Sequence, residues 1–440
     1  MRSLLLLLLL VSVTACEIVD NQKIVKLDAF EIANPPPSAR DFVAQNKSHK
    51  ILVAVIDSGV DYNHSKLTSH IHFTLDAKGQ AIGAGYDFVA DDNWPAPYIV
   101  RTGHYDPKAN ADRKADALLA IANFEKAAGY LTKWSKSFLN PIRAIDQEMT
   151  AGTYHGTHVA GLSVYDKPEI GILPYRVLPR NITGEGPLDA EELAVVANQL
   201  FSAVDKAAAA GASVINISLG FSAKESEGDE YEKIKALAVQ WDQVVAKYPD
   251  VLFVAAAGND GAWIDQNVRV NFPCGSKLPN LLCVGSLADD SEVSDFTNVV
   301  LSGAEIVFAL GEDVISTFPE LTCPSSSAGR TMAGAKDEKT YTTAVEAFEA
   351  DCKDYKGLAP LSGTSMASPI TARIAALLRL ASPEAKPATI VATIKASGNK
   401  GTIGTFEITK LDVEKPSWYQ SQLPIWNMTP KWSAFVPKKK

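Results

Sequence analysis

A serine flanked by small residues is the first candidate for chemistry. Residues 363–369 read Gly-Thr-Ser-Met-Ala-Ser-Pro and place Ser365 before an alanine- and leucine-rich stretch, Ile370–Leu380, that predicts a buried helix. Small neighbours allow a tight turn that leaves the hydroxyl open, and the positive end of the helix favours negative charge there. The same residues could form an ordinary helix start with Thr364 or Ser365 as its cap. A serine nucleophile needs a base and an orienting acid, so the rest of the chain must supply them.

The candidate base lies in a helical pattern with two histidines. His155 and His158 occur in the sequence His-Gly-Thr-His-Val-Ala-Gly, whose small residues allow close helix packing. A histidine with a pKa near neutrality can take a serine proton and return it to a leaving group. Histidines at this spacing could also hold a metal on one helical face, but they lack the intervening glutamate of His-Glu-x-x-His zinc proteases. We expect His155 to be the base and His158 to be a packed structural residue.

The candidate acid follows a strand pattern. Ile51–Ile56 is an unbroken apolar run rich in β-branched residues, which predicts a buried strand of a parallel sheet, and Asp57 comes directly after it. In open α/β sheets the working residues lie beyond the carboxyl ends of the strands. A carboxylate there can accept the Nδ1 proton of an imidazole and fix its tautomer. An aspartate that only caps the next turn is the alternative.

These three stretches resemble the catalytic motifs of the subtilisin-like serine proteases, or subtilases. Their chain order, Asp57, His155, Ser365, is the order of subtilisin and differs from those of chymotrypsin and the α/β-hydrolases. The resemblance covers most of residues 50–398. It implies an α/β fold, a subtilisin-like three-layer α/β/α sandwich with a mainly parallel central sheet. It also implies a serine endopeptidase that acts on protein or peptide substrates through an acyl-enzyme.

The resemblance implies further roles between the motifs. Asn259, after the apolar run Val251–Ala257, matches the asparagine that donates to the oxyanion, although Asn-Asp-Gly is also a simple turn. The segment after Val214–Ile217 matches the one whose backbone pairs with extended substrate. Phe221 stands where the family usually has a second glycine, which alters the pocket edge, and His64 fits a structural turn after Asp57. The expected substrate-binding residues are Ser218, Leu219, Gly220, Ala256, Ala257 and Gly258.

The first residues predict export and a lipid anchor. Residues 1–3 supply one positive charge, Leu4–Val11 is an apolar run too short to span a membrane, and Val-Thr-Ala at 13–15 precedes Cys16. This pattern resembles the lipobox of bacterial lipoproteins, which implies cleavage before Cys16 and lipidation of that residue in the cell envelope. Glu17 in place of aspartate favours the outer membrane by analogy. An ordinary cleaved signal with an incidental cysteine is the alternative.

The remaining chain is divided by composition and by comparison with a simple subtilase. The expected segments are a signal peptide at 1–15, a lipidated tether at 16–43, a peptidase domain at 44–399 with insertions at about 104–150 and 318–358, and a C-terminal extension at 400–440. The proline-containing tether is typical of a flexible linker. It is too short for the inhibitory prodomain of secreted subtilases, so the route of activation stays open.

The five cysteines and the net charge limit the other possibilities. With Cys16 lipidated, four cysteines remain in a compartment that permits disulfides, and they allow three connectivities. We favour Cys274–Cys283 and Cys323–Cys352, because each pair closes a local loop, with free buried thiols as the alternative. The formal net charge of −9 disfavours nucleic-acid binding. The expected chemistry requires no metal or cofactor, while the acidic segment 87–92 leaves structural calcium open.

Two other interpretations stay open. The chain could be a binding protein or pseudoprotease on a subtilase scaffold, although every expected catalytic residue is present. It could also be a processing peptidase that is inactive until a partner arrives, which would fit its insertions and short tether. In the favoured interpretation we expect a monomer.

Overall fold

The computed structural model describes residues 41–95, 151–178, 190–319 and 357–412, apart from gaps at 63, 90, 266–267, 289–291 and 302, together with helical positions 343, 347 and 350. Several predictions lie outside the described residues: the signal peptide, Cys16 and nearly all of the tether, the first insertion, most of the second, Cys323, Cys352, and residues 413–440.

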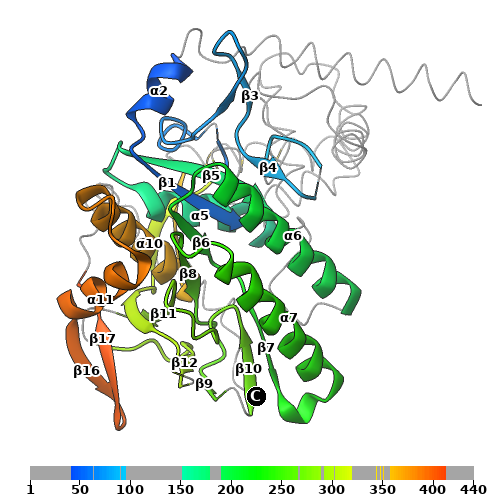
Figure 1. The fold of residues 1–440 in the computed structure, drawn as a ribbon, viewed down its shortest axis with the longest axis vertical. Coiled ribbons are helices and arrows are strands. Elements are labelled where there is room, and N and C mark those ends of the chain that lie inside the picture. Colours follow the sequence, from blue (N-terminus) through cyan, green and yellow to red (C-terminus); the bar gives the residue numbers. More distant parts are fainter. Residues whose placement is uncertain are drawn as a thin grey trace, which may run out of the picture.

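A nine-stranded sheet forms the centre of the molecule. Its strands are β1 (Ile51–Asp57), β4 (Tyr86–Asp87), β5 (Ile170–Arg176), β6 (Val214–Ile217), β8 (Leu252–Ala256), β11 (Leu281–Leu287), β13 (Ile306–Leu310), β16 (Asn399–Ile403) and β17 (Phe406–Lys410). They are arranged in the order β16-β17-β13-β11-β8-β6-β1-β5-β4 (Figure 1). Every neighbouring pair is parallel except β16 and β17. The predicted, mainly parallel sheet is therefore confirmed.

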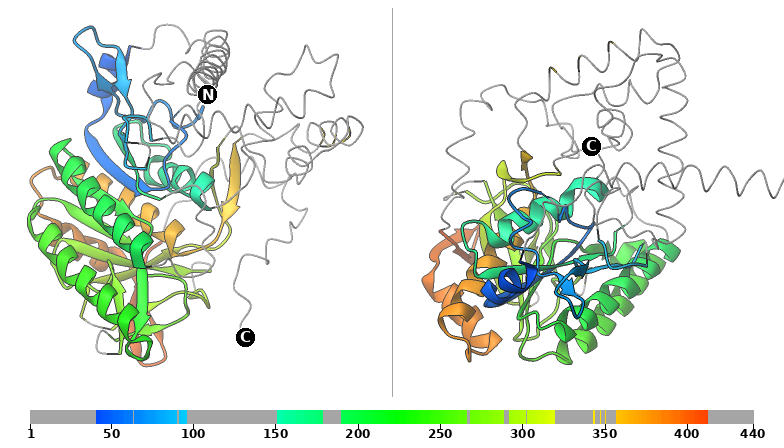
Figure 2. Two further views of the ribbon diagram at one scale, coloured as in Figure 1. Left: turned by 90° about the vertical axis from the view of Figure 1, so that its right-hand side faces the viewer. Right: turned by 90° about the horizontal axis from the view of Figure 1, so that it is seen from above.

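Helices cover both faces of the sheet, because the apolar strands need burial on both sides. They are α5 (Ala151–Val164), α10 (Thr364–Ala381) and α11 (Pro387–Ser397) on one face, and α6 (Ala190–Ala209) and α7 (Asp229–Ala246) on the other. Within β1, Val53 and Val55 belong to the first core, whereas Ala54 and Ile56 belong to the second. Figure 2 shows α6 and α7 side by side on their face. This is the expected three-layer sandwich.

Two glycines allow α5 to lie close to its neighbours. A Cβ on Gly156 would lie 2.2 Å from the carbonyl oxygen of Gly59 and 3.1 Å from Oδ1 of Asp57. A Cβ on Gly161 would lie 2.2 Å from Oγ1 of Thr317. The two 2.2 Å distances are shorter than real Cβ contacts, so a larger residue at either position would force its neighbours to move. The close packing of the helix that carries His155 therefore depends on these glycines.

The helix after the serine is buried, as predicted, and packs against α5 and several strands of the sheet. Gly363 precedes α10 as its N-cap residue, and it has no side chain with which to cap the helix. The alternative in which Thr364 or Ser365 serves as a cap is therefore not what the structure contains.

Shorter elements surround the sheet. They are α2 (Phe42–Ser48), the 3-10 turn at Glu225–Glu227, and the strand pairs β2 (Thr74–Leu75) with β3 (Ala81–Gly83), β7 (Phe221–Lys224) with β10 (Arg269–Phe272), β9 (Trp263–Ile264) with β12 (Val299–Val300), and β14 (Val314–Thr317) with β15 (Leu358–Leu361). The segment expected to be a C-terminal extension begins with the hairpin β16–β17, and β17 pairs with β13. The domain boundary expected at residue 399 therefore falls inside the sheet.

Within the described part of the chain, no helix has the length and apolar character that crossing a membrane requires.

Four histidines are buried in ways that favour their neutral form. Burial lowers the pKa of His49 to about 4. Burial, followed by the charge of His155, lowers the pKa of His158 to about 3. Burial also lowers the pKa values of His70 and His72. An unfolded chain would bind protons at these positions near the ordinary pKa of about 6.5.

We expect the free energy of unfolding to fall as the solution is acidified from about pH 6.5 to about pH 5. The four histidines keep folded pKa values below the unfolded value, so their contribution is complete above about pH 6.5 and is lost below it. The raised pKa of His155 changes the free energy of unfolding only at pH values above this window. Urea unfolding at the two pH values tests the prediction, and an equal or higher midpoint at the lower pH would contradict it.

Candidate active site

Asp57 and His155 meet at the carboxyl end of β1. Asp57 is the last residue of the strand and is completely buried, and His155 lies in α5. Nδ1 of His155 donates to Oδ1 of Asp57 over 2.8 Å, and the backbone N–H of Ser58 donates to the same oxygen over 2.7 Å. Oγ of Ser58 accepts from the N–H of Gly156 over 3.0 Å, which attaches the histidine segment to the strand end. The predicted acid and base are thus brought together.

The pKa of His155 reflects two opposing effects. Burial favours the neutral imidazole, but the charge of Asp57 and its hydrogen bond favour the protonated form. The second effect is larger, so the pKa is raised above the ordinary value of 6.5. Because Nδ1 donates to Asp57, Nε2 is the ring nitrogen through which a neutral His155 can accept a proton.

The other two motif histidines make structural contacts. Nε2 of His158 donates to the carbonyl oxygens of Val314 and Ala359, at 2.9 and 3.1 Å, so it joins α5 to the β14–β15 pair. Nε2 of His64 donates to the carbonyl oxygen of Gly357 over 2.7 Å. Both side chains are fully buried. They occupy the structural positions that the sequence predicted.

Ser365 lies in the first turn of α10 and faces the segment after β6. Its hydroxyl donates to the carbonyl oxygen of Ser218 over 3.1 Å, and the hydroxyl of Ser218 donates to the carbonyl oxygen of Ser365 over 2.9 Å. Behind this pair, Nδ2 of Asn216 donates to Oγ of Ser218, and Oδ1 of Asn216 accepts from Oγ of Ser368. Sequence reasoning missed Asn216 and Ser368, although both are polar residues inside predicted buried elements, which was an available signal.

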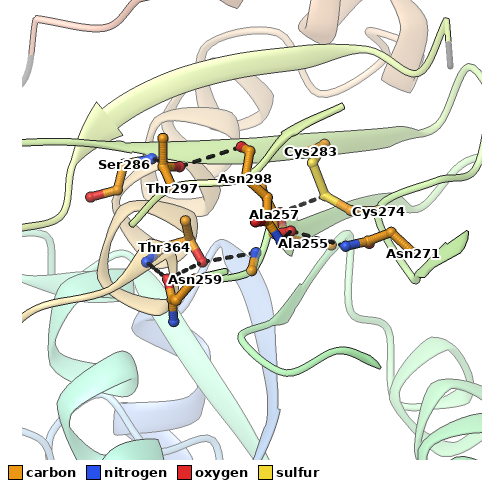
Figure 3. The surroundings of a disulfide bond; sticks show 11 residues. Ala255, Ala257, Asn259, Asn271, Cys274, Cys283, Ser286, Thr297, Asn298 and Thr364 are labelled. Atoms are coloured by element: carbon orange, nitrogen blue, oxygen red, sulfur yellow. Dashed lines mark hydrogen bonds between the residues drawn. A yellow bond between two sulfur atoms is a disulfide. The ribbon is translucent and has the colours of Figure 1, made fainter. Parts of the chain in front are cut away.

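Thr364 holds the side chain of Asn259 in one orientation (Figure 3). Oδ1 of Asn259 accepts from the backbone N–H of Thr364 over 2.9 Å and from its hydroxyl over 3.0 Å. Oγ1 of Thr364 also accepts from the N–H of Gly258 over 3.1 Å. The amide oxygen of Asn259 is therefore occupied, and its Nδ2 group is the end available to donate elsewhere. Sequence reasoning considered Thr364 only as a helix cap and missed this contact.

The expected pocket residues lie at the end of β8 and in the turn after it, which asparagine side chains hold. Ala256 and Ala257 are buried, and Gly258 has a φ of +98°, a conformation that favours glycine. The carbonyl oxygen of Ala257 accepts from Nδ2 of Asn271 over 3.0 Å and from Nδ2 of Asn298 over 3.1 Å. The two amides fix the path of the chain just before Asn259.

A disulfide joins Cys274 to Cys283, as predicted, and lies beside this turn (Figure 3). It links the loop after β10 to β11 in the central sheet. Phe221, the residue that departs from the family pattern, stacks on Phe272 of β10, with ring centroids 6.1 Å apart and planes inclined by 4°. Leu219 and Gly220 lie between β6 and β7, outside any strand.

The acidic segment after β3 uses its carboxylates within the protein. Oδ2 of Asp87 accepts from Arg176 over 3.0 Å, and both side chains are buried. Asp91 accepts from the hydroxyl of Tyr86, and Oδ1 of Asp92 accepts from the N–H of Trp94. In the ranges that the structure describes, no group of three or more His, Cys, Asp or Glu residues is arranged to hold a metal ion.

Comparisons with known proteins agree with this geometry. The sequence profile of the subtilase family, peptidase S8, matches residues 48–410. Subtilisin DY of Bacillus licheniformis is 30% identical over 237 residues, which cover 52% of this chain and 64% of that protein. The halolysin-like extracellular serine protease Nep of Natrialba magadii is 26% identical over 371 residues, covering 81% of this chain and 47% of that protein. A solved lanthipeptide protease matches with a TM-score of 0.52 at 18% identity, covering 92% of this chain and 95% of that chain.

The chain spans about half to two thirds of the length of these curated relatives. The match to the solved protease shows a shared fold. The family profile extends from the residues before β1 to the end of β17 and includes all three motifs. The chain belongs to the subtilase family.

Proposed function

We propose that this chain is a serine endopeptidase that hydrolyses peptide bonds with Ser365 as nucleophile, His155 as general base and acid, and Asp57 as the orienting carboxylate. The observation that carries the proposal is the 2.8 Å hydrogen bond between Nδ1 of His155 and the buried Oδ1 of Asp57. It leaves Nε2 as the nitrogen that can accept the serine proton, and α5 packs directly on the helix that carries Ser365. Membership of the subtilase family supports the same chemistry.

The proposed reaction begins when the hydroxyl of Ser365 turns from the carbonyl of Ser218 toward His155. Nε2 then takes the proton as Oγ attacks the carbonyl carbon of the peptide bond, and Asp57 stabilises the imidazolium that forms. His155 returns the proton to the leaving amine, and water hydrolyses the acyl-enzyme by the same route. The raised pKa of His155 means that the neutral base is the main form only above that pKa.

We assign the stabilisation of the oxyanion to Nδ2 of Asn259 and the backbone N–H of Ser365. Thr364 occupies the amide oxygen of Asn259 with two hydrogen bonds, so the donor end is orientated before substrate arrives. In the same proposal, the backbone of Ser218, Leu219 and Gly220 pairs with extended substrate. Residues 256–258 form one wall of the pocket for the residue before the cleaved bond.

We also propose that the enzyme is exported and anchored through a lipid on Cys16, with the outer membrane as the favoured site. The support is the resemblance of residues 13–16 to a lipobox, together with the extracellular relative Nep. No cofactor is needed for the proposed chemistry, and the proposed enzyme is a monomer.

One contact favours a partner-activated peptidase as a second candidate. The ring of Tyr154, next to His155, stacks on Phe318, with centroids 4.9 Å apart and planes inclined by 19°. Phe318 follows β14, where the second insertion begins, and residue 151 opens α5, where the first insertion ends. A protein bound to either insertion could therefore act on the position of the base.

Labelling with a fluorophosphonate probe tests the nucleophile. We expect an adduct on Ser365, located by mass spectrometry, and none in the Ser365→Ala variant, because the probe reacts with an activated serine. The same label on another residue would contradict the assignment. A folded protein that is labelled only after a partner is added would favour the second candidate.

Substitution of Asn259 and Thr364 tests the oxyanion donor. We expect Asn259→Ala to lower kcat by about 10²–10³ with little change in KM, a range measured on subtilisin itself for loss of one donor. Thr364→Val should lower kcat roughly fivefold, because the orientation of Asn259 loses a hydrogen bond of about 1 kcal/mol.

The matched control is Thr364→Ser, which keeps the hydroxyl and should restore kcat. If Thr364→Val and Thr364→Ser lower kcat equally, the hydroxyl does not orientate Asn259. If Asn259→Ala raises KM but leaves kcat unchanged, the side chain binds substrate and does not stabilise the transition state.

Replacement of Cys16 tests the anchor. Wild-type protein should be recovered with membranes and should carry a lipid on its first mature residue by mass spectrometry. Cys16→Ser should remove the lipid and release the protein into the soluble exported fraction, since the thiol is the attachment atom. Membrane recovery of Cys16→Ser equal to that of wild type would contradict a lipid anchor at this residue.

A further inference from the structure

Three of the chain's seven histidines lie together at the end of the sheet opposite the candidate active site. His49 directly follows α2 and comes just before β1, whereas Asp57 ends that strand, roughly 20 Å further along. His70 and His72 flank Ile71, which pairs with Ile172 of β5. The proposed peptidase chemistry uses none of these three side chains.

The rings of His49 and His72 face each other through their Nδ1 atoms, which are 3.2 Å apart. Nε2 of His49 lies 3.1 Å from the carbonyl oxygen of Ser69. A carbonyl only accepts, so this nitrogen carries the proton of the neutral ring. Nδ1 of His49 therefore presents a lone pair to His72, and Nδ1–H of His72 donates to it.

The separation of the two Nδ1 atoms is close to that of two imidazole nitrogens bound to one metal ion. Histidine nitrogens bind zinc at about 2.0–2.1 Å, so two of them in a tetrahedral site lie about 3.3 Å apart. A metal-bound histidine also donates its other ring N–H to a carboxylate, a backbone carbonyl or water, which fixes the tautomer. The bond from Nε2 of His49 to Ser69 is such a contact. Both features are already present in the chain.

The surrounding residues hold the His49 ring firmly and leave a path from solvent. A Cβ on Gly171 would lie 2.7 Å from Cγ and Nδ1 of His49, so glycine is needed for the ring to lie against β5. His49 is 9% exposed, while His72 is only partly buried, so an ion would enter from the side of His72.

We propose that His49 and His72 bind one divalent transition-metal ion through their Nδ1 atoms, with water molecules completing its coordination. Imidazole ligands favour ions such as Zn²⁺ and Cu²⁺ over the oxygen-preferring Ca²⁺ and Mg²⁺. No third His, Cys, Asp or Glu ligand is in place among the described residues, so the site has two protein ligands. The proton on Nδ1 of His72 moves to its Nε2 when the ion replaces the hydrogen bond.

The ion would connect two segments that are far apart in sequence. α2 is already attached to residues 68–73, because Gln45 donates to the carbonyls of Thr68 and Ile71 and Asn46 exchanges hydrogen bonds with the backbone of Phe73. A metal between residues 49 and 72 would strengthen this attachment at the start of the domain. Binding to the folded chain alone would stabilise it against unfolding.

Titration of the metal-depleted full chain with Zn²⁺ and Cu²⁺ tests the proposal. We expect one ion bound per chain at this site, and a Cu²⁺ electron paramagnetic resonance spectrum with coupling to two imidazole nitrogens. His72→Asn should weaken binding at least about tenfold, because its amide can still donate to His49 but offers no ligand nitrogen. The matched control is His70→Asn, since Nδ1 of His70 donates to the carbonyl of Ile170 over 3.0 Å and needs only a donor.

Zn²⁺ should also raise the unfolding temperature of wild type and His70→Asn, but not that of His72→Asn. Equal binding by wild type and His72→Asn would overturn the proposal, as would the absence of a bound ion. If His72→Asn does not fold, the wild-type copper spectrum decides, and coupling to fewer than two nitrogens overturns the site. None of these measurements uses peptidase activity, so the result is independent of the proposed function.

Discussion

The hydrogen bond between His155 and Asp57 depends on how the chain buries a carboxyl group at the end of a strand. Asp57 is inaccessible to solvent, and an unpaired buried carboxylate would be costly. Two donors to its Oδ1 come from the next residue, Ser58, and from His155, which is 98 positions away in sequence. The pairing of β1 with both β5 and β6 fixes the strand end, and Gly156 lets α5 reach it. The hydrogen bond that orients His155 is therefore also one that the buried carboxyl group of Asp57 needs.

A second constraint acts at the start of α10. The first N–H groups of a helix have no partner within the helix, and a side-chain cap normally satisfies one of them. The N-cap residue of α10 is Gly363, which has no side chain to cap the helix, and the N–H of Thr364 donates instead to the side chain of Asn259 in the turn after β8. The N-terminal turn that holds Ser365 is thus left open on the side where the proposed oxyanion would form. A conventional serine or threonine cap would have occupied the groups that this proposal requires.

The parts that the sequence predicted are those set by local patterns. Unbroken apolar runs identified central strands, and candidate residues such as Asp57 and Asn259 come soon after them. The nine-residue separation of Cys274 and Cys283 suggested their pairing. The contact of Ser368 with Asn216 spans 152 positions. A polar residue in a buried element indicates that it needs a partner, but which partner it meets follows from the topology of the sheet. The pairing of residues 399–410 with the sheet was not predicted, for a related reason. β16 is an exposed edge strand without an apolar run, so its composition does not distinguish it from a polar extension.

The histidines show why residue type alone does not determine chemical role. His155 and His158 lie on the same helix, three residues apart, yet the pKa of the first is raised and that of the second is lowered to about 3. The first faces a carboxylate, whereas the second faces two backbone carbonyls through a single nitrogen. This difference matters for proton transfer. When His155 becomes positively charged, a second cation beside it would oppose the step, and the burial of His158 prevents that by keeping its ring neutral.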